Sequence, residues 1–148
     1  FIVLDSGEDK EDSHIEYGGM TDYNTSRAKM LEWLKETEVT NEKVITLSHA
    51  WQISDVEEDL SVEAWNEIDR IGTRLIISGH THDCRLIGDA SEEEEKILSA
   101  HPDIIGYMDG GKQKSIYTAS KMTLSADGFN LTAFNNSGEK VFDESFDW

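Results

Sequence analysis

Two short apolar segments that each end in histidine constrain this chain most strongly. Residues 43–48 are rich in aliphatic side chains and run into His49, and residues 74–78 run into Gly79-His80-Thr81-His82. Apolar runs of this length predict strands that are buried inside a sheet. Polar residues that directly follow such strands lie at the sheet edge where ligands gather in α/β proteins.

Helical patterns precede both segments. Residues 25–36 and 61–70 each place apolar residues at helical spacing, so they predict amphipathic helices that pack on the sheet. We expect Asn24 or Thr25 to cap the first helix. The apolar side of the second helix is expected to consist of Val62, Trp65 and Ile68.

The second half of the chain changes character. Residues 91–98 predict a short acidic helix in which Ser91 and Glu94 have the spacing of a capping box. Beyond Pro102 the sequence predicts strands separated by turns, at residues 104–108, 115–118, 122–124, 128–134 and 139–142. With a strand at residues 1–4 and a loop at residues 6–24, residues 1–148 predict one layered α/β domain completed by antiparallel strands.

Charge and composition exclude some classes of partner. The chain has 148 residues, of which 13 are basic and 31 acidic, and a formal net charge of −18. This balance argues against a nucleic-acid surface and an anionic membrane face, because both need clustered Lys and Arg. No apolar run approaches the ~20 residues of a transmembrane helix. With Cys84 as the single cysteine, no internal disulfide forms, so localisation stays unassigned.

The three histidines at the strand ends are the main candidate site. Because consecutive α/β units place the carboxyl ends of their strands at one edge, His49, His80 and His82 are expected to converge there. Imidazole is a ligand for transition metals such as Zn and Fe. The alternative is a plain α/β binding domain in which the three imidazoles are structural and point away from one another. Convergence within about 5 Å would favour a shared metal site.

Several neighbouring residues are further candidates. Trp51 either stacks on a substrate base or sugar at the mouth of the site or packs in a helix core. Asp83 is expected to orient an imidazole through a hydrogen bond. Residues 55–59 are read as a lid or a solvated face, and Cys84 as a small hydrophobe. Surface positions are predicted for His14, His101 and residues 92–95.

The two histidine motifs resemble those of a known family. Ser48-His49 after one strand and Gly79-His80-Thr81-His82 after the next look like the last two motifs of the calcineurin-like metallophosphoesterases, which include the purple acid phosphatases. The opening residues 1–6 resemble the strand after the family's Gly-Asn-His-Asp/Glu motif. Residues 137–143 resemble its terminal hairpin. The resemblance implies an αββα-type layered fold, of which residues 1–148 would be the C-terminal part.

The resemblance also implies a dinuclear metal site. In that family two divalent ions such as Mn, Fe or Zn share a bridging carboxylate and a bridging solvent. By resemblance, His49 and His80 would ligate one ion and His82 the other. The remaining ligands come from Asp-x-His, Gly-Asp-x-x-Asp and Gly-Asn-His-Asp/Glu motifs, which the resemblance places before residue 1, and none of these motifs is expected within this chain. The parent domain would hydrolyse a small phosphate ester, whereas this chain alone would bind at most one metal, weakly, without useful turnover.

A second function class is compatible with the same motifs. The family includes non-catalytic scaffolds, so a metallophosphoesterase-like interaction module is the alternative to the enzyme. Half of a two-sheet sandwich would also expose apolar surface and unpaired strand edges. We therefore expect self-association through exposed sheet surface.

Overall fold

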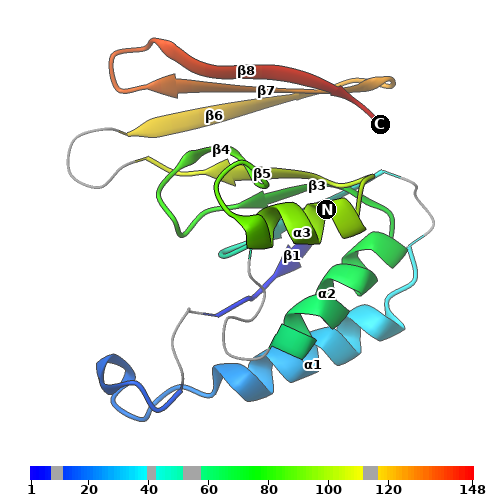
Figure 1. Ribbon diagram of the computed structural model, residues 1–148, viewed down its shortest axis with the longest axis vertical. Helices are drawn as coiled ribbons and strands as arrows, with labels where there is room; N and C mark the ends of the chain where they lie inside the picture. Colours follow the sequence, from blue (N-terminus) through cyan, green and yellow to red (C-terminus); the bar gives the residue numbers. More distant parts are fainter. Residues whose placement is uncertain (8–11, 40–42, 52–57, 112–116) are drawn as a thin grey trace.

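A five-stranded sheet forms the middle layer of the structure (Figure 1). The computed structural model describes residues 1–7, 12–39, 43–51, 58–111 and 117–148. The strands of this sheet lie in the order β1-β2-β3-β5-β4, and the first four are parallel while β4 is antiparallel to β5. Their bounds are β1 Ile2–Leu4, β2 Val44–Ser48, β3 Thr73–Ser78, β4 Cys84–Leu86 and β5 Ile105–Asp109.

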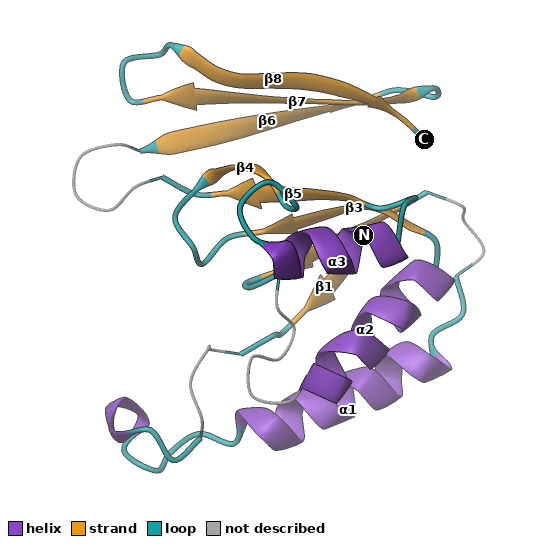
Figure 2. Cartoon of the chain, viewed as in Figure 1, coloured by secondary structure: helices purple, strands orange, loops and turns teal. Residues whose placement is uncertain are grey.

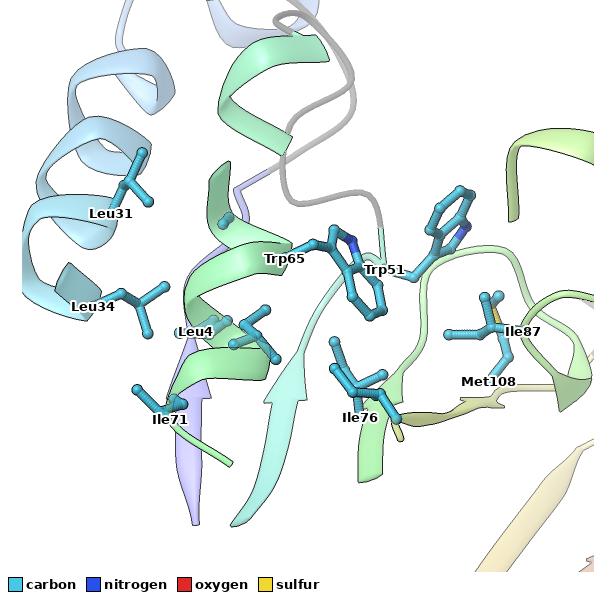
Figure 3. Packing of buried hydrophobic residues seen from close by; sticks show 12 residues of the cluster. Leu4, Leu31, Leu34, Trp51, Trp65, Ile71, Ile76, Ile87 and Met108 are labelled. Atoms are coloured by element: carbon cyan, nitrogen blue, oxygen red, sulfur yellow. The ribbon is translucent and has the colours of Figure 1, made fainter. Parts of the chain in front are cut away.

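Helices cover one face of this sheet (Figure 2). They are α1 Tyr23–Glu36, α2 Glu58–Arg70 and α3 Glu92–Ala100, and a short 3-10 helix, η1, spans Ile15–Tyr17. The helices bury apolar side chains against the sheet in one cluster (Figure 3), which includes Leu34, Trp51, Trp65, Ile68, Ile76, Ile87 and Met108. Burying these side chains removes large apolar areas from water and is the main driving force for this layer contact.

A three-stranded antiparallel sheet covers the other face. Its strands lie in the order β6-β7-β8, with bounds β6 Thr118–Leu124, β7 Gly128–Asn135 and β8 Lys140–Asp147. The core between the two sheets contains Ile45, Leu75, Tyr107, Phe129, Leu131, Phe142 and Phe146. On β7 and β8, Asn130, Thr132, Asp143 and Ser145 form a hydrogen-bonded polar row.

The predicted mixed α/β architecture is confirmed at this coarse level. The strands at 1–4, 43–48, 74–78, 104–108 and 128–134 and the three helices occur within three residues of their predicted bounds. The strand predicted at 139–142 is also present, but it extends to Asp147. Two details were wrong. β4 was not predicted, and β6 is one strand over Thr118–Leu124 where two were expected. Residues 115–116 of the first predicted strand, and residues 55–57 of the predicted lid, lie outside the described residues.

Two expectations about helix ends and faces were also wrong. The side chain of Asp22, and not Asn24 or Thr25, caps α1 by accepting from the Thr25 N–H at 3.3 Å. Val62 is 48% exposed, because α2 turns Trp65 and Ile68 to the core but not Val62. Residues 6–24 are not all loop, since they include η1 and the start of α1.

Two polar residues expected at the surface are buried by specific partners. His101 is 6% exposed, because its Nδ1 lies 2.9 Å from Asp69 Oδ2 and its ring stacks on Trp65. Glu94 is 3% exposed and accepts two hydrogen bonds from Arg85, at 2.7 and 2.8 Å. It also accepts from the N–H groups of Gly88 and Ala90. Glu94 therefore organises the β4–α3 connection, and Ser91 caps α3 through the Glu94 N–H.

Within the described residues, no helix is both long and apolar enough to cross a lipid bilayer.

The first prediction concerns the Arg85–Glu94 pair. We expect Glu94→Ala to lower the free energy of unfolding by about 3 kcal/mol, because it removes the two strongest hydrogen bonds of the Arg85 guanidinium, which keeps only the Leu86 carbonyl and Asp83 as partners, and leaves two N–H groups unpaired. Glu95→Ala, at an exposed position of the same helix turn, is the matched control and should cost no more than about 0.5 kcal/mol. Urea unfolding measures both values, and equal losses would contradict the assigned role of Glu94.

The same pair predicts an acid dependence of stability. Burial alone would raise the pKa of Glu94, but the hydrogen bonds from Arg85, Gly88 and Ala90 outweigh it and hold the pKa below its ordinary value. A lowered pKa stabilises the folded state fully above the pKa of an unfolded glutamate, about 4.3, and this contribution is lost as the pH falls through the folded pKa. The stability difference between wild type and Glu94→Gln should therefore shrink below that pH.

Candidate functional site

The structure brings two of the three candidate histidines together at the carboxyl edge of the central sheet. Ser48 pairs with Ser78 at the last register position of β2 and β3, and the Gly79 N–H donates to the His49 carbonyl at 3.0 Å. This hydrogen bond continues the pairing of β2 and β3 beyond the ends of the strands, so the side chains of His49 and His80 lie next to each other. His80 Nδ1 lies 3.0 Å from His49 Nε2, and the ring centroids are 4.9 Å apart at an interplanar angle of 76°.

The spacing of this nitrogen pair is close to that of two metal ligands. Imidazole nitrogens bind a zinc-like ion at about 2.0–2.1 Å, so two of them at the tetrahedral angle lie about 3.3 Å apart, a little farther than in the present contact. Without an ion, one ring nitrogen donates a hydrogen bond to the other. A bound cation would take the place of that proton, with the two rings turned slightly apart so that both lone pairs face the ion. His49 and His80 can therefore serve as adjacent ligands of a single ion.

His82 does not form a metal-binding group together with His49 and His80. Among the residues that the structure describes, no three His, Cys, Asp or Glu side chains are arranged to hold a metal ion. His80 and His82 both have left-handed backbone, with φ of 66° and 58°. Their side chains therefore do not follow the extended-backbone geometry expected from the sequence, in which residues two apart share a face. Of the three candidate histidines, the structure thus brings His49 and His80 into direct contact.

A chain of buried hydrogen bonds fixes the backbone beside His49. The Ala50 N–H donates to Ser6 Oγ at 3.0 Å, which joins the end of β1 to the end of β2. Arg27 Nε donates to the Ser6 carbonyl at 2.8 Å, and Ser48 Oγ donates to the Ala50 carbonyl at 2.8 Å. All four residues are buried. Because buried polar groups lose stability when their partners are removed, this network resists movement of His49.

Trp51 and Asp83 have structural partners. Trp51 is 3% exposed and belongs to the apolar cluster under the helices (Figure 3), which favours the packing interpretation over stacking on a substrate. Asp83 Oδ2 lies 3.7 Å from Arg85 Nε, so the carboxylate forms an ion pair at the start of β4. Gln52, next to Trp51, lies outside the described residues.

The sequence analysis missed one carboxylate at the same edge. Asp109 ends β5, and its Oδ1 accepts a hydrogen bond from Ser120 Oγ at 2.7 Å. Ser120 in turn contacts the Tyr107 hydroxyl at 2.7 Å, and Tyr107 contacts Cys84 Sγ at 3.2 Å. Burial raises the pKa of both Tyr107 and Cys84, so Cys84 is a neutral thiol near pH 7. The strand-end rule that selected His49 would also have selected Asp109.

The expectation that no Asp-x-His motif occurs within this chain is wrong, because Asp12-Ser13-His14 has that pattern. The Asp12 carboxylate accepts from the N–H groups of Tyr23 and Asn24 at 2.7 and 3.1 Å. The His14 ring accepts from the Glu16 N–H at 3.3 Å. Asp12 thus binds the first turn of α1 beside the Asp22 cap, and His14 caps η1 with a side chain that is 39% exposed.

Comparisons with known proteins add no relative. No protein-family model matches the chain, and no curated protein matches it.

The packing role of Trp51 gives a second prediction. Trp51→Ala should lower the free energy of unfolding by about 3–5 kcal/mol, the usual loss for a buried Trp. Trp33→Ala is the matched control, because Trp33 is 47% exposed on α1 and should cost much less. Thermal or urea unfolding of both variants measures the difference. A stable Trp51→Ala protein would return Trp51 to the list of candidate substrate contacts.

Proposed function

We propose that this chain is part of a metal-dependent phosphoesterase, in which His49 and His80 share one divalent ion and a small phosphate ester is the substrate. The observation that carries this proposal is the 3.0 Å contact between His49 Nε2 and His80 Nδ1 at adjacent ends of parallel strands. An ion bound by two imidazoles at such an edge keeps several coordination positions open for phosphate oxygens and water.

Electrostatics support a cation at this position. The chain has a formal net charge of −18, which attracts divalent cations and repels a free phosphate ester. Bound ions in phosphoesterases polarise the phosphoryl group and activate water. The protein contributes the fixed separation of the two imidazoles, which the register of β2 and β3 and the Ser6–Ala50 hydrogen bond maintain.

The resemblance adds a second ion, for which His82 is the proposed ligand. Two divalent cations near each other need carboxylates to offset their charge. His82 and the pair of His49 and His80 supply none. We therefore propose that the isolated chain binds at most one ion, weakly, and does not turn over phosphate esters.

A non-catalytic interaction module with the same fold is the second candidate. The observation that favours it is the lack, among the described residues, of any group of three or more His, Cys, Asp or Glu side chains arranged around a common ion. In that case the His49–His80 pair would be a hydrogen-bonded element of the sheet edge, and phosphate esters would not bind.

Metal titration tests the proposal. We expect isothermal titration calorimetry with Zn²⁺ or Mn²⁺ to detect one site in the wild-type chain. His49→Ala and His80→Ala should each weaken binding at least about tenfold, because each removes one of two protein ligands. His14→Ala, at a partly exposed histidine that caps η1, is the matched control and should bind as the wild type does. Equal affinities for all four proteins would contradict the proposed site.

An activity assay separates the ion site from turnover. With saturating Mn²⁺ or Zn²⁺, we expect the chain alone to hydrolyse a chromogenic phosphodiester no faster than its His80→Ala variant. Metal-dependent hydrolysis that the variant abolishes would show that the chain is active by itself, and the proposal of an incomplete site would then be wrong.

A further inference from the structure

The segment that contains His80 and His82, residues 79–83, has to cross the end of a neighbouring strand. β3 leads through residues 79–83 into β4, but β5 lies between β3 and β4 in the sheet. Asp109, the last residue of β5, pairs with Cys84 at the start of β4. Residues 79–83 therefore pass over the carboxyl end of β5. The left-handed residues His80 and His82 make this short crossing possible.

Gly110 is the point of closest approach beneath this crossing. A Cβ atom on Gly110 would lie 3.1 Å from the His82 Cα, 3.4 Å from the Asp83 carbonyl oxygen and 3.5 Å from the Asp83 nitrogen. These are backbone atoms, so no side-chain rotation could relieve the contact. At Gly79 the same test gives 3.6 Å to the Asp109 oxygen and 3.7 Å to the His49 oxygen, which are ordinary contacts. The tight position is thus Gly110.

The middle of the crossing is also attached to β5. Thr81 Oγ1 donates a hydrogen bond to Sδ of Met108, which is fully buried in the helix-side cluster. Non-glycine residues in left-handed conformation carry backbone strain and persist only where their surroundings hold them. The end of β5 supplies those surroundings, through the Thr81 anchor and the close fit at Gly110.

We propose that Gly110 is a positioning residue for the candidate metal site, and that the end of β5 holds His80 in contact with His49 by supporting the strained turn from below. A side chain at position 110 would lift His82 and Asp83 from the strand end and rotate the turn that begins at Gly79. The metal-affinity part of this inference rests on the proposed function, whereas the imidazole geometry does not.

Gly110→Ala tests the inference, with Gly106→Ala as the matched control. Gly106 lies on the same strand, and its added Cβ would lie 2.8 Å from the Ile87 Cβ, so this substitution disturbs β5 at least as much as Gly110→Ala but away from the turn. Without metal, long-range ¹H–¹⁵N spectra of the imidazole rings should show that Gly110→Ala changes the nitrogen shifts of His49 and His80 while Gly106→Ala leaves them unchanged. With Zn²⁺, Gly110→Ala should bind about tenfold more weakly than the control.

The outcomes separate this inference from the proposed function. If the wild type binds no Zn²⁺, the proposed function fails and the metal-free spectra alone decide the inference. Unchanged imidazole shifts in folded Gly110→Ala would overturn it. If Gly110→Ala does not fold, Thr81→Val takes its place, because it removes the hydrogen bond to Met108 and keeps the side-chain shape. Changed His80 shifts would support the inference, and unchanged shifts would overturn it.

Discussion

The parallel register of β2 and β3 is the constraint on which the candidate site depends. Ser48 pairs with Ser78, and the next rung joins the Gly79 N–H to the His49 carbonyl. A shift of one residue would turn every side chain of one strand to the opposite face, and the imidazoles of His49 and His80 would separate. The 3.0 Å contact between their nitrogens is therefore a consequence of how two buried strands pair.

The register is in turn fixed by packing on both faces of the sheet. Ile76 contacts the helix layer, and Leu75 contacts the three-stranded sheet, so each residue of β3 has a specified side. Thr46 and Thr73 add a buried hydrogen bond of 2.8 Å across the two strands. These contacts keep the carboxyl edge of the central sheet rigid, and this edge supports the strained turn that contains His80 and His82.

Local patterns predicted the strands, the helices and the position of His49 and His80, because apolar periodicity and strand ends can be read over a few residues. What failed depended on distant partners. The burial of Glu94 needs Arg85 on β4, and that of His101 needs Asp69 on α2. The left-handed backbone of His82 follows from the placement of β5 between β3 and β4. No residue within the turn itself signals that topology.

Anomalous diffraction from crystals soaked in Mn²⁺ or Zn²⁺ tests the central claim most directly. We expect one strong peak within about 2.0–2.2 Å of both His49 Nε2 and His80 Nδ1, with the hydrogen bond between the two rings replaced by the ion. A peak bound to other residues, or no peak while the two nitrogens stay hydrogen-bonded at a saturating metal concentration, would contradict it.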